Sequence, residues 1–395
     1  MSARALIIGL NFLPDPGGIA KYLGKICEHM PPEKFHVFAL DRDTAPTYDK
    51  QQPFKIHRGT LKDQLPTAMY SMLVKTIGSY TQQMFWWLQF YPRFLRLCKQ
   101  EKTNVIVCGH IAVGLVSWLL AKKLKCKFVI VTYGNEITGP VERNQPIEYW
   151  FCKFLLNQAD AIVSISNFTT DAVLQWGVSP EKIHKIHPGV DPKIFHPNIS
   201  TANIIEKHNL KESHVILTVA RLVERKGHDM IIQGMPKILA DVPNTKYLII
   251  GTGRFQDSLK QLAEDIGVAD HIIFAGYIKD EMLPNYYCAS DVFVMPSRQM
   301  VGSVEGFGIV YLEANACGKP VIAGRSGGSL DAIVDGETGL FVDSTNIDDI
   351  ANAIIRILRD KSYANILGQK GRQHVETKLS WAISAQKFIE VIERL

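Results

Sequence analysis

Two glutamates, Glu305 and Glu313, stand eight positions apart where a loop should turn into a helix. Glycines lie between them and apolar residues follow at helical spacing, so we expect a helix from about Gly308 to just before Gly318. Glu305 would then lie just outside the helix N-terminus. Because side chains on a helix lean toward its N-terminal end, Glu313 could point back to the same place. The spacing therefore predicts two carboxylates that face one small space.

Backbone N–H groups should line that space as well. The first turn of a helix has no internal partners for its N–H groups, and the helix dipole is positive there, so an anionic phosphate oxygen is favoured. Carboxylates repel phosphate and would instead accept hydrogen bonds from neutral hydroxyls, so a ligand with both phosphates and sugars fits. An ordinary turn with an acidic first helical turn remains open as the alternative. The candidate residues are Glu305, Gly306, Phe307, Gly308, Ile309 and Glu313.

A cationic loop is expected after the predicted strand at residues 215–219. Arg221 and Lys226 follow this strand and precede a glycine and a helix. Arg can hold phosphate oxygens in a fork and Lys adds a point charge, and each charge-assisted contact would be worth about 1.5 to 3 kcal/mol. A pair of solvated surface charges is the alternative, and the spacing and context favour it less.

Paired glycines follow the first predicted strand, at residues 5–10. Gly17 and Gly18 separate this strand from an expected helix at residues 19–30, and such a pair allows a ligand to approach the backbone closely. A plain turn would use the same residues. The pair is therefore weak evidence when it is taken alone.

At residues 303–328 the chain resembles the donor-site signature of retaining glycosyltransferases of the GT-B fold, family four. The matching features are a Glu, seven residues and a second Glu, set in EGFGIVYLEA and followed by GKPVIAGRSGG. The resemblance extends over most of the chain. It implies that Glu305 and the following amides contact the donor sugar and phosphate, while Glu313 binds the ribose hydroxyls. It also implies that Arg221 and Lys226 neutralise the leaving diphosphate.

The same resemblance adds substrate-binding candidates in loops that follow predicted strands. The first glycine pair matches the family's N-terminal glycine loop, which lies over the donor diphosphate from the opposite domain. Tyr133 stands where many relatives carry a His near the donor sugar, so the role of that His cannot be carried over. Backbone groups at Tyr277 and Ile278 are expected to contact the base. The set outside the Glu-bearing loop is Gly17, Gly18, Tyr133, Glu136, Gly253, Tyr277 and Ile278.

The length of the chain predicts two domains, because 395 residues are too many for one typical domain and 46% hydrophobic residues suffice for two cores. We expect an acceptor-side Rossmann-like domain at 1–187 and, after a linker at 188–205, a nucleotide-sugar-binding Rossmann-like domain at 206–378. By resemblance, a terminal helix at 379–395 crosses back to the first domain. The predicted class is α/β with the GT-B fold, in which two doubly wound Rossmann-like domains face a cleft.

Composition argues against several other classes. The seven cysteines show no Cys-x-x-Cys spacing and no His and carboxylate cluster has ligand spacing, so we expect no disulfide framework, no metal site and no cofactor. The apolar run at the N-terminus is too short for a signal peptide, and the longest candidate for a membrane span, at residues 105–121, is broken by glycines and a His. A cytoplasmic protein without a nucleic-acid partner is predicted.

Basic charge is concentrated in one part of the sequence. Residues 67–135 hold nine Lys or Arg against one acid, although the whole chain is only +5. Within this part, residues 84–102 predict an amphipathic helix with a basic side and an aromatic side, kinked at Pro92. Such a helix could lie on an anionic membrane, which would make the protein peripheral on the inner membrane face. It could equally pack on the N-terminal sheet with a solvated basic edge.

The predicted reaction transfers a hexose from a nucleotide diphosphate sugar to a hydroxyl of a glycan or lipid-linked acceptor. By resemblance it retains the anomeric configuration, and it needs no divalent metal because cationic side chains stabilise the leaving diphosphate. GDP-mannose is the first expected donor, and UDP-glucose, UDP-galactose or an N-acetylhexosamine donor is the alternative. A sugar-binding protein should instead carry an export signal, and a nicotinamide dehydrogenase should show a fuller glycine fingerprint.

Overall fold

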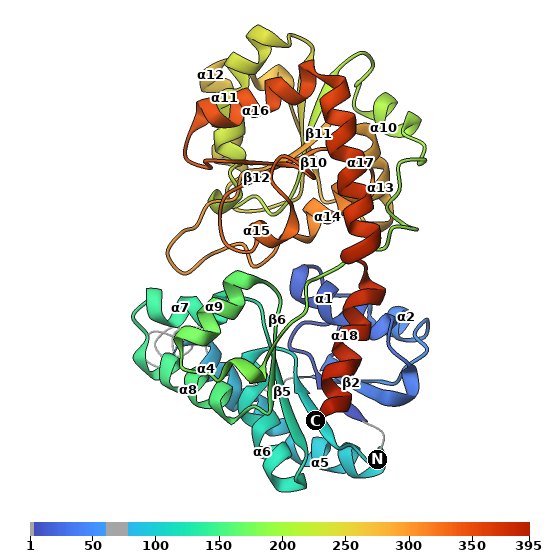
Figure 1. Cartoon of the computed structure of the whole chain (residues 1–395), viewed down its shortest axis with the longest axis vertical. Coiled ribbons are helices and arrows are strands. Elements are labelled where there is room, and N and C mark those ends of the chain that lie inside the picture. Colours follow the sequence, from blue (N-terminus) through green and yellow to red (C-terminus); the bar gives the residue numbers. More distant parts are fainter. Residues whose placement is uncertain (1–3, 61–77) are drawn as a thin grey trace. The chain divides into compact units, whose positions relative to one another are not determined.

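The computed structural model describes residues 4–60 and 78–395, and it divides the chain into two compact units. Unit 1 comprises Met1–Pro188 and Trp381–Leu395, and unit 2 comprises Gly189–Ser380. Each unit is built on one parallel sheet covered by helices (Figure 1). These two sheets confirm the predicted class of two doubly wound α/β domains.

The sheet of unit 1 has seven parallel strands in the order β3-β2-β1-β4-β5-β6-β7. The chain reverses its direction of growth across the sheet between β1 and β4, and ligands of open α/β sheets bind at the carboxyl ends of strands at such a point. The strands are β1 (Ala5–Ile8), β2 (Phe35–Leu40), β3 (Ile56–Gly59), β4 (Val105–Cys108), β5 (Lys127–Thr132), β6 (Ala161–Ser164) and β7 (Ile183–Lys185). The helices are α1 (Gly18–Glu28), α2 (Ala45–Asp49), α4 (Ser79–Trp87), α5 (Tyr91–Gln100), α6 (Gly114–Leu124), α7 (Asn135–Glu142), α8 (Pro146–Gln158), α9 (Asn167–Gln175) and α18 (Trp381–Arg394).

The segment 84–102, expected as one kinked helix, is interrupted before its proline. It forms the end of α4, a 3-10 turn at Leu88–Phe90 and then α5, which has Pro92 in its first turn, where a proline costs no hydrogen bond. The expected polar side is exposed: Gln89, Arg93, Arg96 and Gln100. Much of the aromatic side is not, because the rings of Phe90 and Phe94 pack on Phe38 of β2 at 5.1 and 4.6 Å.

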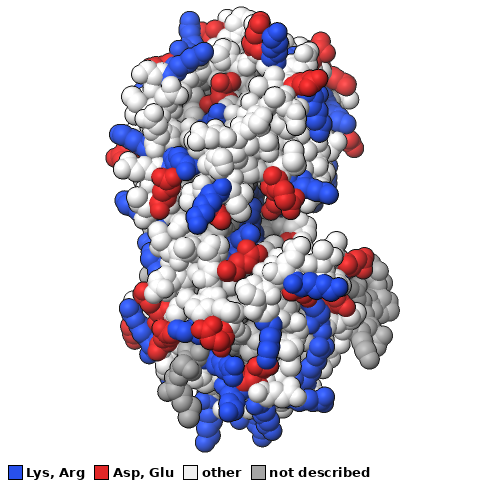
Figure 2. All heavy atoms as spheres, turned by 90° about the vertical axis from the view of Figure 1, so that its right-hand side faces the viewer, with Lys and Arg blue, Asp and Glu red and all other residues white. Residues whose placement is uncertain are grey.

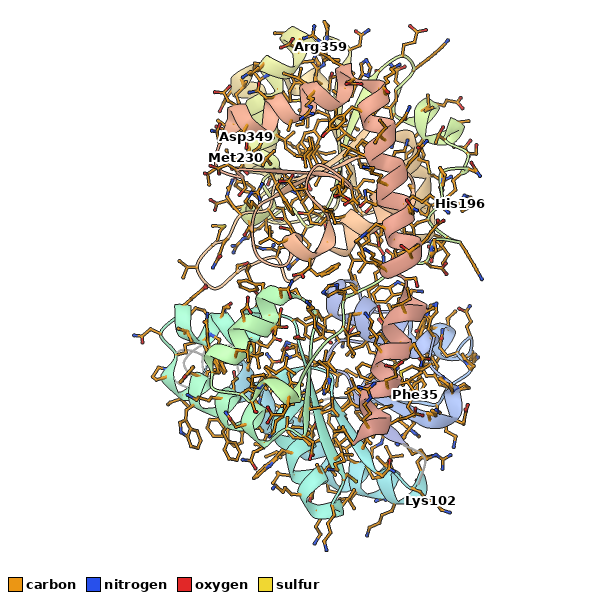
Figure 3. All side chains as sticks on the ribbon, in the orientation of Figure 1. Phe35, Lys102, His196, Met230, Asp349 and Arg359 are labelled. Carbon is orange, nitrogen blue, oxygen red and sulfur yellow. The ribbon has the colours of Figure 1, made fainter. Side chains whose placement is uncertain are left out.

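Positive charge gathers at the end of unit 1 where α5 and α6 lie. Figure 2 shows Lys and Arg side chains crowding this lower end, with few acidic side chains among them. Lys102, just after α5, reaches out from the same end in Figure 3. The predicted concentration of basic residues is thus present on the surface, apart from residues 67–77, which lie outside the described residues.

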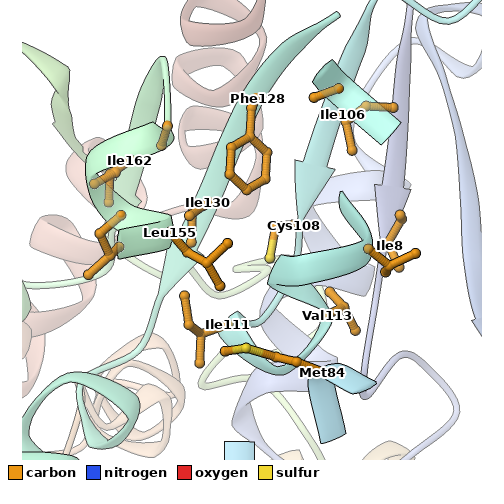
Figure 4. Packing of buried hydrophobic residues seen from close by; sticks show 14 of the residues in the cluster. Ile8, Met84, Ile106, Cys108, Ile111, Val113, Phe128, Ile130, Leu155 and Ile162 are labelled. Atoms are coloured by element: carbon orange, nitrogen blue, oxygen red, sulfur yellow. The ribbon is translucent and has the colours of Figure 1, made fainter. Parts of the chain in front are cut away.

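One face of the first sheet carries the main hydrophobic core of unit 1. Buried side chains of β1, β4, β5 and β6 meet apolar residues of α4, α6 and α8, as Met84, Ile130 and Leu155 illustrate in Figure 4. Helices cover both faces of a parallel sheet, so its strands are buried on both sides and appear as continuous apolar runs in the sequence. This is why the strands could be predicted from the sequence.

The sheet of unit 2 has six parallel strands in the order β10-β9-β8-β11-β12-β13. Its strands are β8 (His214–Val219), β9 (Thr245–Ile250), β10 (Ile272–Gly276), β11 (Val292–Met295), β12 (Val321–Gly324) and β13 (Leu340–Val342). Its helices are α10 (Ala202–Lys207), α11 (His228–Asp241), α12 (Gln256–Ile266), α13 (Leu283–Ala289), α14 (Ile309–Ala316), α15 (Ser329–Ala332), α16 (Ile347–Arg359) and α17 (Lys361–Lys378). Because β8 and β11 are neighbours, the loops that follow them lie side by side.

The last helix, α18, packs within unit 1. Trp381 at its start contacts the ring of Tyr22 in α1, with ring centroids 6.2 Å apart, and the hydroxyl of Ser384 donates to the carbonyl of His187 at 2.7 Å. Of the segment 188–205, which was expected to be a linker, residues from Gly189 onward belong to unit 2. Among residues 4–60 and 78–395, no helix is both long and apolar enough to cross a membrane.

Candidate active site

The helix after Glu305 begins where the sequence predicts. Strand β11 ends at Met295, and after a loop α14 starts at Ile309, with Gly308 as the residue before it. Gly308 has φ 92° and ψ 64°, and a Cβ there would lie 2.4 Å from the ring of Tyr311. Only glycine fits both demands. Gly308 has no side chain that could cap this N-terminus, in keeping with its expected use for a ligand.

Glu305 is buried and accepts hydrogen bonds from two cations. Its Oε2 accepts from Lys226 Nζ at 2.5 Å and from Arg225 Nη1 at 2.8 Å, and the hydroxyl of Ser297 lies 3.4 Å away. Lys226 and Arg225 are themselves buried. The cationic loop and the Glu-bearing loop, predicted separately, are therefore joined in one cluster, which we call the Glu305 cluster: Arg225, Lys226, Ser297 and Glu305.

The formal charge of the cluster is positive. Burial alone would raise the pKa of Glu305, but the nearby Lys226 and Arg225 outweigh it and lower this pKa to about 2. Burial lowers the pKa of Lys226, although Glu305 opposes that shift. Two cations facing one carboxylate leave one positive charge uncompensated, which suits a phosphate.

Glu313 has a different partner. It is buried within α14, and its Oε2 accepts from the hydroxyl of Tyr287 in α13 at 2.8 Å. Burial raises the pKa of Tyr287 well above its ordinary value, and Glu313 adds to this, so the hydroxyl stays a hydrogen-bond donor. The bond fixes the orientation of the carboxylate that was expected to bind ribose hydroxyls.

A pocket of about 550 Å³ opens in unit 2 beside the cationic loop. Three arginines line it, namely Arg221, Arg225 and Arg254, together with Gly253 from the loop after β9 and Ser303 from the Glu-bearing loop. The Nε of Arg225 is buried and has no hydrogen-bond partner among the described residues. A ligand with phosphate oxygens could satisfy it.

Close backbone packing brings the pocket loops together. The N–H of Leu222 donates to the carbonyl of Thr252 at 3.0 Å, and a Cβ on Gly253 would lie 2.3 Å from the carbonyl oxygen of Leu222. A glycine at this position is therefore required for the loops after β8 and β9 to touch. The contact sets Arg221 and Gly253, both predicted site residues, on the wall of one pocket.

A buried histidine supports the loop that carries Arg221. His228 Nδ1 lies 3.1 Å from the hydroxyl of Tyr247, and its Nε2 lies 3.4 Å from the carbonyl oxygen of Arg221. Burial lowers the pKa of His228 to about 4, so the ring is neutral at physiological pH. Nothing in the sequence indicates this role, because His228 stands at the start of an ordinary amphipathic helix.

The amide positions after Glu305 lie against another glycine loop. The N–H of Gly328 donates to the carbonyl of Glu305 at 2.8 Å, and a Cβ on Gly328 would lie 1.8 Å from the carbonyl oxygen of Gly306. Phe307 is also buried. The remaining candidates of unit 2 follow β10, where Tyr277 is 66% exposed and Ile278 is half-buried. Their binding roles stay predictions.

In unit 1 the predicted candidates lie at carboxyl ends of strands. Gly17, with φ 118°, precedes α1, and a Cβ on it or on Gly18 would meet no atom within 4 Å. Tyr133 is buried and its hydroxyl donates to the carbonyl of Gly109 at 2.9 Å, while its N–H donates to the carboxylate of Glu136. Burial raises the pKa of Glu136 to about 7, although hydrogen bonds from the backbone at residues 133, 134 and 136 oppose this rise. Tyr133 and Glu136 thus stabilise the loop itself.

Comparison with known proteins decides the family. The model for Glycosyltransferase Family 4 matches residues 16–194, and the model for glycosyl transferases group 1 matches residues 200–374. The GDP-mannose-dependent alpha-(1-6)-phosphatidylinositol monomannoside mannosyltransferase of Mycolicibacterium smegmatis is 30% identical, over 98% of this chain and 97% of that enzyme. The chain belongs to the group 1/family 4 glycosyltransferases. It is therefore an enzyme that transfers a hexose, and its donor is a nucleotide sugar.

Other relatives of this glycosyltransferase agree. The GDP-mannose-dependent monoacylated alpha-(1-6)-phosphatidylinositol monomannoside mannosyltransferase of Corynebacterium glutamicum is 29% identical, over 99% of this chain and 98% of that enzyme. Among solved structures, Alr3699/HepE of Anabaena in complex with UDP has a TM-score of 0.82 at 18% identity, over 100% of both chains. Sucrose-phosphate synthase of Thermosynechococcus elongatus has a TM-score of 0.80 at 24% identity, over 99% and 98%. These two likenesses confirm the GT-B fold.

Proposed function

We propose that this glycosyltransferase is a retaining, metal-independent mannosyltransferase that uses GDP-mannose and acts on a glycan or lipid-linked acceptor. The donor assignment is supported by the GDP-mannose-dependent relatives that match almost the whole chain. The chemistry is supported by one observation above all, the Glu305 cluster beside a pocket lined by three arginines. This arrangement combines a fixed carboxylate with excess positive charge.

The cations would act on the leaving group. As the bond between the sugar and the diphosphate breaks, negative charge grows on the diphosphate, and preorganised cations that lie beside it lower the barrier. We assign this role to Arg221 and Lys226, with Arg225 and Arg254 as further pocket cations. Side chains supply this charge at fixed positions, so the proposed reaction requires no divalent metal and no cofactor.

The two carboxylates would hold hydroxyl groups of the donor. The hydrogen bonds of Glu305 to Arg225, Lys226 and Ser297 all use Oε2, so we assign Oε1 to a hydroxyl of the donor sugar. We assign Glu313, held by Tyr287, to the ribose. Retention would follow if the acceptor attacks from the face that the diphosphate leaves, as in the family that the chain resembles. Gly17, Gly18, Gly253, Tyr277, Ile278 and the amides at residues 306–309 complete the proposed donor contacts.

We also propose that the enzyme works in the cytoplasm. All seven cysteines are free thiols, the state that a reducing compartment maintains.

A ligand panel tests the donor and the metal together. A ligand that binds only the folded protein raises its melting temperature by mass action. GDP and GDP-mannose should raise it, with and without EDTA, and UDP and UDP-glucose should raise it less. A larger shift with the UDP compounds would refute GDP-mannose as the donor and indicate a UDP-sugar. Loss of the shift in EDTA would refute metal independence. No shift with any nucleotide would refute the proposed site. Retention is read separately from the anomeric configuration of the product by NMR.

A further inference from the structure

Aromatic rings from three helices of unit 1 form a continuous row that is partly exposed. Phe85 of α4 contacts Phe151 of α8 at 6.2 Å between ring centroids, and Phe151 contacts Trp150 at 5.3 Å. Trp150 stacks on Phe154 at 5.9 Å, and Phe154 meets Trp118 of α6 at 5.2 Å. Trp150 is 61% exposed and Phe85 47%. We call these five residues the aromatic band.

Trp118 and Phe154 pack against the core of unit 1, but the exposed Phe85 and Trp150 are not part of it. The inward sides of the same helices already fill it, with Met84 of α4, Val116 and Leu120 of α6, and Cys152 and Leu155 of α8. Large apolar side chains that are exposed in one contiguous patch commonly mark a surface that contacts another apolar phase. The half-exposed Ile147 lengthens the patch at the start of α8.

The exposed charged residues on the helices of the aromatic band and on α5 have one sign. Lys122 and Lys123 follow Trp118 by about one turn of α6 and are exposed, and α5 presents further exposed basic residues to solvent. The four helices α4, α5, α6 and α8 contain one acidic residue, Glu148, which is buried and paired with Arg143 at 3.5 Å. The exposed charges of these helices are therefore all positive.

We infer that the aromatic band and the lysines beside it form the surface by which this enzyme lies on an anionic phospholipid membrane. Trp and Phe rings favour the boundary between headgroups and acyl chains, and Lys and Arg attract anionic headgroups. The segment 84–102 cannot supply this contact by itself, because Trp87, Phe90 and Phe94 are buried in the core. Three helices share the contact instead of one. The inference rests on the proposed function in one respect, namely that the enzyme would reach a lipid-linked acceptor at this membrane surface.

A second copy of the chain fits this surface less well. In a twofold dimer the same patch would face itself, so the lysines beside one band would approach those beside the other. Like charges in such an interface repel, whereas an anionic membrane attracts them. The positive border therefore favours a lipid surface over self-association.

Vesicle flotation tests the inference without donor or acceptor. Wild-type protein should float with vesicles of phosphatidylcholine and phosphatidylglycerol, should stay behind with phosphatidylcholine alone, and should be released by salt. Exchanging Lys122 and Lys123 for Ala should weaken binding about 30-fold, because each basic residue near an anionic surface contributes about 1 kcal/mol. The double variant Phe85→Ser with Trp150→Ser should weaken it about tenfold or more. In the wild type, vesicles should shift the tryptophan emission to shorter wavelength.

Helix α17 of unit 2 offers matched controls, because it carries an exposed Ile366 (48%) and an exposed Lys370. Ile366→Ser and Lys370→Ala should leave vesicle binding unchanged. Each variant of the aromatic band must keep the nucleotide-induced thermal shift of the wild type, which shows that it is folded and separates this test from that of the proposed function. The inference would be overturned if the wild type did not float, if the double variant Phe85→Ser with Trp150→Ser floated equally well, or if the wild type formed a solution dimer that this double variant dissociates.

Discussion

Replacing Arg225 by Met should destabilise unit 2 far more than an ordinary surface substitution. Arg225 is buried, and its Nη1 donates to Glu305 Oε2 at 2.8 Å. Met preserves much of the volume of the Arg stem but removes the charge and the donor. Glu305 would then be left with Lys226 as its remaining charged partner.

The expected loss follows from the burial of the pair. Removing one partner of a buried ion pair costs about 3 to 5 kcal/mol, because the other charge stays buried without compensation. Lys226 still compensates Glu305 in the variant, so we take the lower end, about 3 kcal/mol. For a unit of this size, 1 kcal/mol moves the melting temperature by about 2 to 4 °C, so the transition of unit 2 should fall by about 6 to 12 °C.

The tryptophans allow the two units to be followed separately. All six lie in unit 1, at positions 86, 87, 118, 150, 176 and 381. Tryptophan fluorescence therefore reports the melting of unit 1, whereas calorimetry detects both units. Arg225→Met should lower the melting temperature of the calorimetric transition of unit 2. The melting temperature of unit 1, measured by tryptophan fluorescence, should stay unchanged.

Arg359→Met is the matched control. Arg359 Nη1 lies 2.7 Å from Asp241 Oδ1, almost the same distance as in the buried pair, but these side chains are 64% and 39% exposed. Such surface pairs contribute at most about 1 kcal/mol. Equal melting temperatures for Arg225→Met and Arg359→Met would refute this reasoning. Burial of the Glu305 cluster would then not increase the contribution of its ion pairs to stability. In an assay of sugar transfer from the donor, Arg225→Met should lower kcat more than it raises the KM for the donor, because Arg225 positions Glu305.

Three further predictions concern the same site. The pKa of Glu305 is lowered from 4.5 to about 2, so its ionisation stabilises the fold above pH 4.5 and ceases to do so as the pH falls toward 2; the melting difference between wild type and Glu305→Gln should be full at pH 7 and shrink in acid. Tyr287→Phe removes the donor to Glu313 and should weaken GDP binding about tenfold in calorimetric titration; unchanged affinity would free Glu313 from its assigned role. Arg221→Ala should lower turnover about tenfold to a hundredfold in a product assay, and normal turnover would remove Arg221 from the scheme.

Local pattern was enough for most of the fold. Strands buried on both sides appear as short apolar runs, and glycines that end a strand or precede a helix mark the loops between them. Helix α14 begins at Ile309 because Gly308 adopts a left-handed conformation, and the sequence pointed to that position. Pattern failed at residues 84–102, where the break at Leu88–Phe90 accompanies packing on Phe38, a residue on a strand distant in sequence.

The candidate site shows what local pattern omits. Arg225 precedes Lys226 directly and looks like one more surface charge, yet its partner Glu305 lies 80 residues away. The order of the sheet explains the meeting, because β8 pairs with β11 and their loops share one edge.

A doubly wound sheet places its first and fourth strands side by side, so the predicted class already implied that the loop with Arg225 and the loop with Glu305 would touch. The same rule holds in unit 1. There β1 pairs with β4, and the N–H of Gly109 after β4 donates to the carbonyl of Ile8 at the end of β1 at 2.9 Å. In this chain the information missing from residue spacing was thus the strand order, and the predicted fold class could have supplied it.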